Sequence, residues 1–244
     1  MPFPHYPSIN LTVLKCILAR LTGRRRSLHD DAVRLSAQLR PPIRYEGLEH
    51  IRLQKPYVVM VNHYARPGFS TPWIALGISA VLPAEVTWIM SNEWLFEGNP
   101  FAFVLRPLMR FVLRSITLAY GLVPMPTMVQ GYSTPQERMI GVREAIERVR
   151  EDPNCVLGIT PEGMDSPNGK LMLPPPGVGR FMLHLSEMGL PILPAAVFEA
   201  DGCLHVHFGE PSHLEVAGGL SSLATDLAAR EWIMQKIAYL EKNC

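Results

Sequence analysis

The sequence predicts a single α/β domain, with a mixed β-sheet flanked by helices. Short apolar, β-branched runs alternate with segments of helical periodicity along most of the chain, which is the pattern of strands joined by helices. Turn residues between two apolar runs near the C-terminal end predict a hairpin, which adds antiparallel strands to the sheet. An apolar content of 48% and a charged content of 18% exclude a disordered chain, and 23 prolines favour many short elements over a long helical bundle.

Residues 1–42 are separated from the α/β domain, which we place at 43–244. Residues 1–40 carry seven Lys and Arg side chains against two Asp. The segment 9–21 is too short and too charged to span a bilayer and is not followed by a signal-peptide cleavage site. As a helix, it places one apolar stripe along its length, formed by Leu14, Ile17, Leu18 and Leu21. It is typical of a basic amphipathic helix on an anionic membrane surface, and an ordinary helix packed on the domain is the alternative.

The elements of the first half follow from apolar runs and their boundaries. Pro41-Pro42 ends the N-terminal segment, and Thr71-Pro72 is a helix start, with Thr71 as N-cap and Pro72 at the first helical position. The predicted elements are a strand and turn at 43–51, a strand at 57–60, a helix from Thr71 to about Leu82, a strand at 86–90 and a helix at 101–120.

The helix predicted at 101–120 combines basic and apolar surfaces. It has no acidic residue and places Arg106, Arg110 and Arg114 at four-residue spacing on one face, with Phe and Leu over most of the remainder. Such a surface fits lipid headgroups or a phosphorylated cofactor. The alternative is a core helix whose arginines extend into solvent.

The second half repeats the alternation. Thr134-Pro135-Gln136-Glu137 is a capping box with proline at the first helical position. Ala200-Asp201-Gly202 joins two strand-like runs as a hairpin turn. The predicted elements are a helix from 134 to about 152, a strand at 155–159, a helix at 177–189, strands at 192–198 and 203–208, and a closing amphipathic helix at 221–242.

His63 is the first candidate for chemistry. It follows the strand at 57–60 and precedes the helix start at Thr71, which is where α/β proteins commonly place ligands. A hydrogen-bonded loop histidine without a catalytic role is the alternative for a single His. A second polar stretch, Pro161-Glu162-Gly163, also follows a strand, at 155–159.

Taken together, Asn62-His63 and Pro161-Glu162-Gly163 resemble the PlsC-like glycerolipid acyltransferases, a family that has an Asn-His-x4-Asp motif and, later, a Pro-Glu-Gly-Thr-Arg-Ser block. The resemblance extends, in order and spacing, from about Ile43 to Pro211. It implies a glycerol-phosphate-acyltransferase-like fold. It also implies transfer of a fatty acyl group from acyl-CoA or acyl carrier protein to a hydroxyl of a lipid-like acceptor. No cofactor is implied beyond the donor substrate.

Three positions depart from the family pattern. Gly68 stands where the motif carboxylate would be, and Met164-Asp165 replace Thr-Arg. The segment 121–126, which corresponds to the family's middle block, has no arginine. A glycine cannot orient the His63 imidazole, so either another group such as Glu93 or a backbone carbonyl substitutes, or catalysis is weak or absent. The missing arginines favour an acceptor without a phosphate next to the reacting hydroxyl, or a phosphate held by Arg66.

The resemblance assigns roles to a small set of residues. His63 would act as general base on the acceptor hydroxyl, a role that suits a neutral imidazole near pH 7. Backbone N–H groups near Gly163 or the start of the helix at Thr71 would stabilise the oxyanion. Glu162 would hold the acceptor or brace its loop. Substrate contacts are expected from Asn62, Arg66, Pro161, Glu162, Gly163 and Ser166.

Two other functional classes stay open. The chain could be a catalytically inactive relative that binds lipid or acyl chains, or an acyl-thioesterase in which water replaces the alcohol. In either enzyme or binding protein, the expected partners are an acyl donor, a lipid or alcohol acceptor and a membrane surface. The four cysteines are far apart, which favours reduced thiols in a cytosolic setting. Together with the basic N-terminal segment, this predicts a peripheral position on the cytoplasmic face of a membrane.

Other kinds of site have little support in the sequence. A net charge of +1 gives no electrostatic case for nucleic acid, and no nucleotide-binding glycine motif is present. We expect no metal. Alternation would place Cys203, His205 and His207 on one face of a strand, where they could bind zinc. We favour the alternative, in which Leu204, Val206 and Phe208 face the core and the polar side chains face water.

Overall fold

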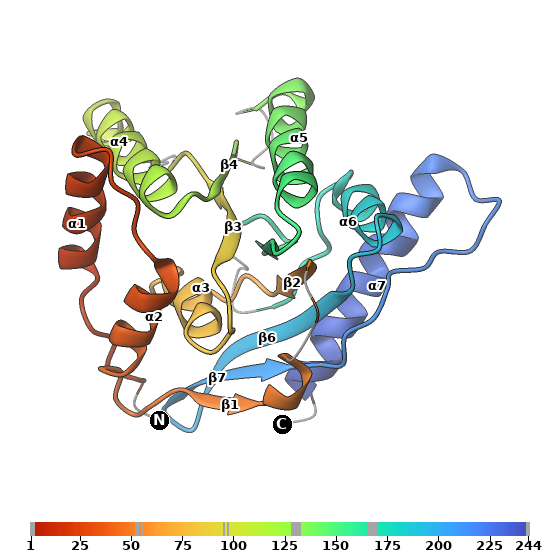
Figure 1. The fold of residues 1–244 in the computed structure, drawn as a ribbon, viewed down its shortest axis with the longest axis horizontal. Helices are drawn as coiled ribbons and strands as arrows, with labels where there is room; N and C mark the ends of the chain where they lie inside the picture. Colours follow the sequence, from red (N-terminus) through yellow and green to blue (C-terminus); the bar gives the residue numbers. More distant parts are fainter. Residues whose placement is uncertain are drawn as a thin grey trace.

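The structure is a computed structural model that describes residues 3–51, 54, 56–94, 96, 98–127, 133–164 and 170–242. In this part of the chain, seven strands form one sheet in the order β1-β7-β6-β2-β5-β3-β4 (Figure 1). The strands are β1 (Arg44–Glu46), β2 (Tyr57–Val61), β3 (Val86–Ser91), β4 (Val123–Met125), β5 (Val156–Ile159), β6 (Ile192–Ala200) and β7 (Cys203–Phe208). The predicted α/β fold with a mixed sheet is therefore confirmed.

Strand directions place the ends of five strands at one edge of the sheet. β6, β2, β5, β3 and β4 run parallel to their neighbours in this series, whereas β7 is antiparallel to β6 and β1 is parallel to β7. β2 lies in the middle and is buried at every position, as expected for an apolar strand covered on both faces. The segments that follow β2, β3, β4 and β5 consequently meet at the carboxyl edge.

Helices cover both faces of the sheet (Figure 1). The core on one face includes α2 (Leu28–Ser36) and α3 (Pro72–Ser79). The core on the other face includes α5 (Pro135–Glu151), α6 (Val178–Glu187) and α7 (Ser222–Lys242). A short 3-10 helix, η1 (Leu48–Ile51), follows β1. The chain is thus a three-layer domain, and the two apolar cores hold its helices against the sheet.

The remaining helices, α1 (Asn10–Leu21) and α4 (Ala102–Tyr120), pack against each other beside the first helical layer (Figure 1). Their contact is made by small side chains, because Cys16 and Ala19 of α1 pack on Ala119 of α4. The large apolar side chains instead lie outward. The exposed ones are Leu11, Leu14, Leu18 and Leu21 on α1, and Phe103, Val104, Leu108, Phe111 and Leu118 on α4. We call this exposed set the apolar face of the α1–α4 pair.

The outward leucines confirm most of the stripe predicted on the N-terminal segment, whereas Ile17 is half-buried. The interpretation of 101–120 as an ordinary core helix is wrong, because its Phe and Leu side chains are exposed together with its arginines. Pro107 lies inside α4 and does not end the helix. Among the described helices, none combines the length and apolarity required to cross a bilayer.

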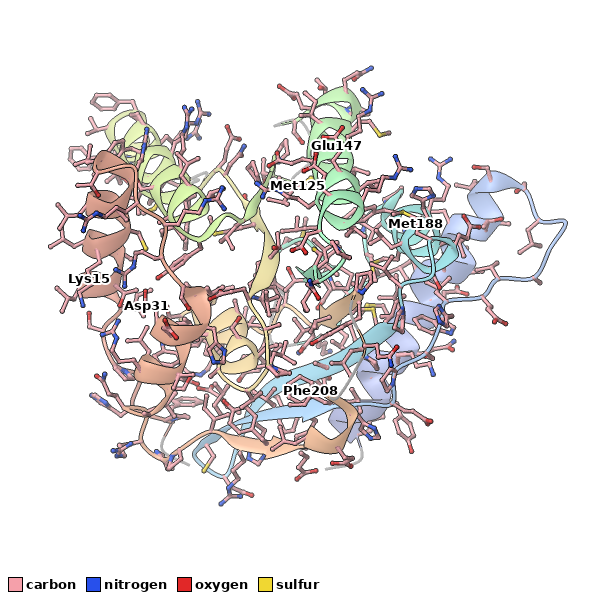
Figure 2. All side chains as sticks on the ribbon, viewed as in Figure 1. Lys15, Asp31, Met125, Glu147, Met188 and Phe208 are labelled. Atoms are coloured by element: carbon pink, nitrogen blue, oxygen red, sulfur yellow. The ribbon has the colours of Figure 1, made fainter. Side chains whose placement is uncertain are left out.

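Two elements were not predicted. α2 begins at Ser27, whose hydroxyl accepts a hydrogen bond from the Asp30 backbone N–H at 2.9 Å, so a capping signal was available in the sequence. β4 is only three residues long and contains Pro124, which hides its strand character. β4 pairs with β3 and lies against α5, where Gly141 allows the close approach (Figure 2 labels Met125 beside α5).

Two local predictions are corrected. Thr71 precedes α3 but has helical backbone angles and makes no side-chain capping bond, so it does not cap the helix as expected. The polar side chains of β7 do not face water: Cys203, His205 and His207 are all buried. The reason is that α7 contacts β6 and β7, and the His205 ring stacks on Phe198 of β6 at 5.1 Å.

Candidate active site

A cavity of about 570 Å³ opens at the carboxyl edge of the parallel strands. Its walls come from the segments that follow β2, β4 and β5 and from the facing sides of α5 and α6. Most of its lining is apolar, which suits an alkyl chain. Residues that line it include His63, Ile89, Met125, Pro161, Gly163, Met139, Val142, Ile146, Ile159, Val178 and Phe181, together with Arg138, Arg180 and His184.

His63 lies at the wall of this cavity, half-buried, in the segment that leaves β2. Its backbone N–H donates a 2.7 Å hydrogen bond to the Glu162 carboxylate. Pro161 and Gly163 on either side of Glu162 line the same cavity. The two stretches that are about one hundred residues apart in the sequence are therefore brought together, with the histidine facing an apolar space.

Glu162 is buried and connects two loops. Its carboxylate accepts the His63 N–H through one oxygen and the Met172 N–H, at 2.8 Å, through the other. Burial raises the pKa of this carboxyl above its ordinary value, while the two backbone bonds oppose that rise. Both carboxylate oxygens are occupied by backbone donors, an arrangement suited to bracing the loop.

Asn62 is also buried, with 2% of its surface exposed, and serves as a junction. Its side chain exchanges two hydrogen bonds with the backbone of Val197 on β6, accepting from the N–H at 2.7 Å and donating to the C=O at 2.9 Å. The amide nitrogen also donates to Glu241 of α7 at 2.9 Å. The structure thus places Asn62 beneath the His63 loop, bonded to β6 and α7.

Arg66 is held by a carboxylate of the protein itself. It forms a two-point ion pair with Glu199, whose oxygens also accept hydrogen bonds from Tyr6 at 2.6 Å and Tyr64 at 3.1 Å. Its guanidinium lies 3.6 Å above the Phe3 ring. The ion pair lowers the pKa of Glu199 against the effect of burial. Arg66 is not among the residues that line the cavity.

The expected oxyanion donors are largely engaged. The Gly163 N–H closes a turn onto the Thr160 carbonyl at 3.1 Å. At the helix start by Thr71, the Trp73 and Ile74 N–H groups donate to the Ser70 and Thr71 carbonyls at 2.9 and 3.0 Å. The start of α6 was not predicted as an oxyanion site, and there Asp226 accepts hydrogen bonds from the N–H groups of Gly177 and Arg180, at 3.1 Å each. Ser166, which was expected to contact substrate, lies outside the described residues, as does Asp165.

The group suggested as a substitute for the motif carboxylate has another partner. Glu93 forms an ion pair with Arg110 of α4. Gly68 itself adopts a left-handed backbone conformation, with φ of 82°, which turns the loop after His63. Among the described residues, no cluster of three or more His, Cys, Asp or Glu is arranged to hold a metal ion.

Several residues of the site were missed by reasoning from sequence. Glu241 carries no local motif and reaches Asn62 only through the fold. Arg138 and Arg180 follow helix starts that were predicted, but their orientation toward one cavity depends on how α5 and α6 pack. Helical periodicity offered one signal, because Arg138 lies four residues before the apolar Val142 and so shares a helix face with it.

Comparisons with known proteins identify a family and a similar fold. The sequence profile of a family described as Acyltransferase matches residues 42–198. The fold is similar to the crystal structure of the 1-acyl-sn-glycerophosphate (LPA) acyltransferase PlsC from Thermotoga maritima, with a TM-score of 0.52 and 17% sequence identity over 88% of this chain and 78% of that one. No curated protein sequence shows significant similarity to the chain.

Proposed function

The chain belongs to the acyltransferase family, and from this membership we propose that it transfers a fatty acyl group from a thioester donor to a hydroxyl of a lipid-like acceptor, with His63 as general base. The observation that carries the proposal is the position of His63 at the wall of an apolar cavity, beside Pro161 and Gly163. The donor would be acyl-CoA or acyl carrier protein, and no other cofactor is required.

The proposed reaction needs one proton carrier. The imidazole of His63 removes the proton of the acceptor hydroxyl as its oxygen attacks the thioester carbonyl, which forms the ester C–O bond. Collapse of the tetrahedral intermediate breaks the C–S bond, and the thiolate recovers a proton from the imidazolium. Glu162 fixes the backbone at His63 through the 2.7 Å hydrogen bond, and Asn62 holds the preceding residue against β6 and α7.

The acyl chain would lie along the apolar wall between α5 and α6. Met139, Val142 and Ile146 on α5 face Val178 and Phe181 on α6 across the cavity. A volume of about 570 Å³ lies within the range of sites that enclose small amphiphiles. The chain end would then be buried while the thioester lies near His63.

The acceptor in this proposal has no phosphate next to the reacting hydroxyl. Met164 stands where the family pattern has threonine, and Arg66 is already neutralised by Glu199. A phosphomonoester placed beside His63 would therefore lack the guanidinium pair that such groups usually receive. A neutral hydroxyl, or one whose phosphate lies farther away, fits the site better.

Membrane attachment forms the second part of the proposal. The apolar face of the α1–α4 pair exposes leucines and phenylalanines near Arg106, Arg110 and Arg114. In this pair, small side chains form the contact between the helices and large apolar side chains lie on the exposed surface, whereas a helix pair in water buries its large apolar side chains. The arrangement suits helices whose outer face lies in lipid. The protein would be peripheral on the cytoplasmic face, which is compatible with the free thiols of Cys16, Cys155 and Cys203.

The test compares wild type with His63→Ala and with His213→Ala, a substitution of an exposed histidine away from the cavity. Acyl-CoA is offered with lysophosphatidate, glycerol phosphate or monoacylglycerol, and both free thiol and acylated product are measured. We expect His63→Ala to lower acyl transfer by about 10² to 10⁴-fold, with His213→Ala unchanged. Acyl release without an acceptor would instead indicate a thioesterase. Lipid binding without turnover in any variant would indicate a binding protein, and either result rejects the acyltransferase proposal.

A further inference from the structure

The cavity lining includes basic side chains. Arg138 of α5 and Arg180 and His184 of α6 line it, and its described lining includes no Asp or Glu. These groups come from the two helices that also supply the apolar wall. An apolar space lined by cationic groups has the chemistry to accept an amphiphile that carries an anionic headgroup.

Both guanidinium groups are positioned by neutral oxygens. Arg138 donates from Nη1 to the Ser133 carbonyl at 3.1 Å and to the Ser133 hydroxyl at 3.0 Å. Arg180 donates from Nη1 to the Ser222 hydroxyl at 2.8 Å. These contacts orient the two side chains and do not themselves neutralise their positive charge.

Several other arginines of the chain differ in this respect. Arg26, Arg66, Arg110 and Arg230 each form an ion pair with a carboxylate. Within the described part of the chain, neither Arg138 nor Arg180 has such a pair. Arg138 and Arg180 combine this property with a position in the cavity lining.

The carboxylates closest in the chain are committed elsewhere. Glu137, next to Arg138, closes the capping box with the backbone N–H of Thr134 at 2.7 Å. Asp226 caps α6 and pairs with Arg230 at 3.0 Å. Neither can turn to neutralise the arginines without giving up a helix cap, which typically costs about 1 kcal/mol.

We propose that Arg138 and Arg180 bind a phosphate group of a substrate whose acyl chain or apolar part occupies the same cavity. This inference rests on the proposed function and refines its substrate class. Guanidinium forks match phosphate oxygens in geometry and charge. The phosphate belongs either to the phosphopantetheine or nucleotide part of the acyl donor or to a part of the acceptor remote from its reacting hydroxyl.

The experiment measures binding of ligand pairs that differ in phosphate. Coenzyme A is compared with pantetheine for the donor, and lysophosphatidate below its micellar concentration with monoacylglycerol for the acceptor. The proteins are wild type, Arg138→Ala, Arg180→Ala, the double variant, and Arg143→Ala as the control. Arg143 is an exposed arginine of α5 that does not line the cavity. Isothermal titration at low and high salt gives the dissociation constants.

We expect wild type to prefer the phosphate-bearing member of one pair, and each arginine substitution to weaken its binding about tenfold. The phosphate-free member and Arg143→Ala should show no change, and salt should reduce the preference. Loss confined to coenzyme A assigns the phosphate to the donor, and loss confined to lysophosphatidate assigns it to the acceptor. Absence of any preference in wild type, or equal binding by wild type and the double variant, overturns the proposal.

Binding and catalysis can fail separately in this design. If the arginines govern phosphate binding but neither wild type nor His63→Ala transfers acyl groups, the phosphate site stands and the proposed function falls. If His63 is required for transfer and the double variant binds every ligand as wild type does, the proposed function stands and the phosphate site falls.

Discussion

The side-chain amide of Asn62 donates a 2.9 Å hydrogen bond to the Glu241 carboxylate, which ties the last helix of the described chain to the residue before His63. The same amide is bonded to the backbone of Val197 on β6. The position of the His63 loop therefore depends on a helix that lies outside the matched family region, residues 42–198. α7 thus acts as a support for the site.

Removing the Glu241 carboxylate should loosen this support. We expect Glu241→Ala to lower the free energy of unfolding by about 1–2 kcal/mol, through loss of the hydrogen bond to a buried amide. It should also lower kcat about tenfold, because small displacements of a catalytic group are costly. Glu241→Gln keeps an acceptor oxygen, so its free energy of unfolding and its kcat should both be close to those of wild type. Urea unfolding and acyl-transfer rates provide the two readouts.

The matched control is Glu231→Ala, which removes an exposed carboxylate from the same helix. It should leave the free energy of unfolding and kcat near their wild-type values. Equal loss in the two variants would mean that Glu241 contributes only general helix stability.

Glu241 should also make stability depend on pH. Burial and the nearby Glu162 carboxylate raise the pKa of Glu241 from 4.5 to about 7. The folded protein therefore holds this proton more tightly than the unfolded chain does. Protonated Glu241 consequently makes its full contribution to the free energy of unfolding below about pH 4.5, and this contribution is lost as pH rises through 7. The group is partly solvated, so we expect a loss of about 1 kcal/mol.

The measurement is urea unfolding of wild type and Glu241→Gln at pH 5.5 and pH 8. The wild type should lose more stability than the variant between these two values. Glu162 has a raised pKa as well and remains in both proteins, so the difference between them isolates Glu241. Parallel behaviour of the two proteins would contradict the assignment.

Substitution of Glu162 tests the brace between the two loops. Glu162→Ala leaves the backbone N–H groups of His63 and Met172 without their acceptor. Each buried unsatisfied donor costs about 1–3 kcal/mol, so we expect a loss of about 2–4 kcal/mol in the free energy of unfolding. Glu162→Gln should recover part of this, because its single amide oxygen replaces only one of the two carboxylate acceptors. Glu210→Ala, at an exposed position, is the control in chemical denaturation.

Arg66 offers a test that separates structure from substrate binding. Arg66→Ala leaves the buried Glu199 carboxylate without its cation, and breaking such a pair typically costs about 3–5 kcal/mol. The double variant Arg66→Ala/Glu199→Gln removes the charge as well and should be more stable than Arg66→Ala alone. KM for a phosphorylated acceptor should stay unchanged in whichever variant folds. A selective rise in KM without loss of stability would restore the role first predicted for Arg66.

Most of the fold could be predicted because its signals are local. The buried run at β2, the capping box of α5 and the hairpin between β6 and β7 each lie within a few residues. β4 escaped prediction, since three residues with a central proline carry almost no strand signal. The water-facing side assigned to β7 was wrong because α7 packs against β6 and β7, a contact that only the fold supplies.

The residues of the candidate site likewise fall into those that a local sequence pattern reveals and those that only the fold reveals. His63 and Glu162 could be found from short sequence patterns, and the structure joins them by one hydrogen bond. Glu199 and Glu241 could not be found, because their importance comes from the partner that folding supplies. Arg66 shows the limit most clearly: the sequence offers a cation next to the histidine, and only the fold reveals the carboxylate that already holds it.

Membrane attachment can be tested on the apolar face of the α1–α4 pair. Leu14 and Leu18 are 51% and 53% exposed, so the double variant Leu14→Gln/Leu18→Gln should leave the folded state almost unchanged in stability. Transfer of a leucine side chain from water to lipid is worth about 1.5–3 kcal/mol. We therefore expect affinity for anionic phospholipid vesicles to fall by more than tenfold in a sedimentation assay.

A second pair of exposed leucines provides the control. Leu223 and Leu227 of α7 are 73% and 39% exposed, and Leu223→Gln/Leu227→Gln makes the same chemical change on another helix. Vesicle binding of this variant should match wild type, because its substitutions lie on α7, outside the α1–α4 pair. Equal losses in both double variants would show that binding follows overall hydrophobicity. A loss confined to Leu14 and Leu18 would place the lipid on the α1–α4 pair, where the exposed apolar side chains accompany a row of arginines that anionic headgroups attract.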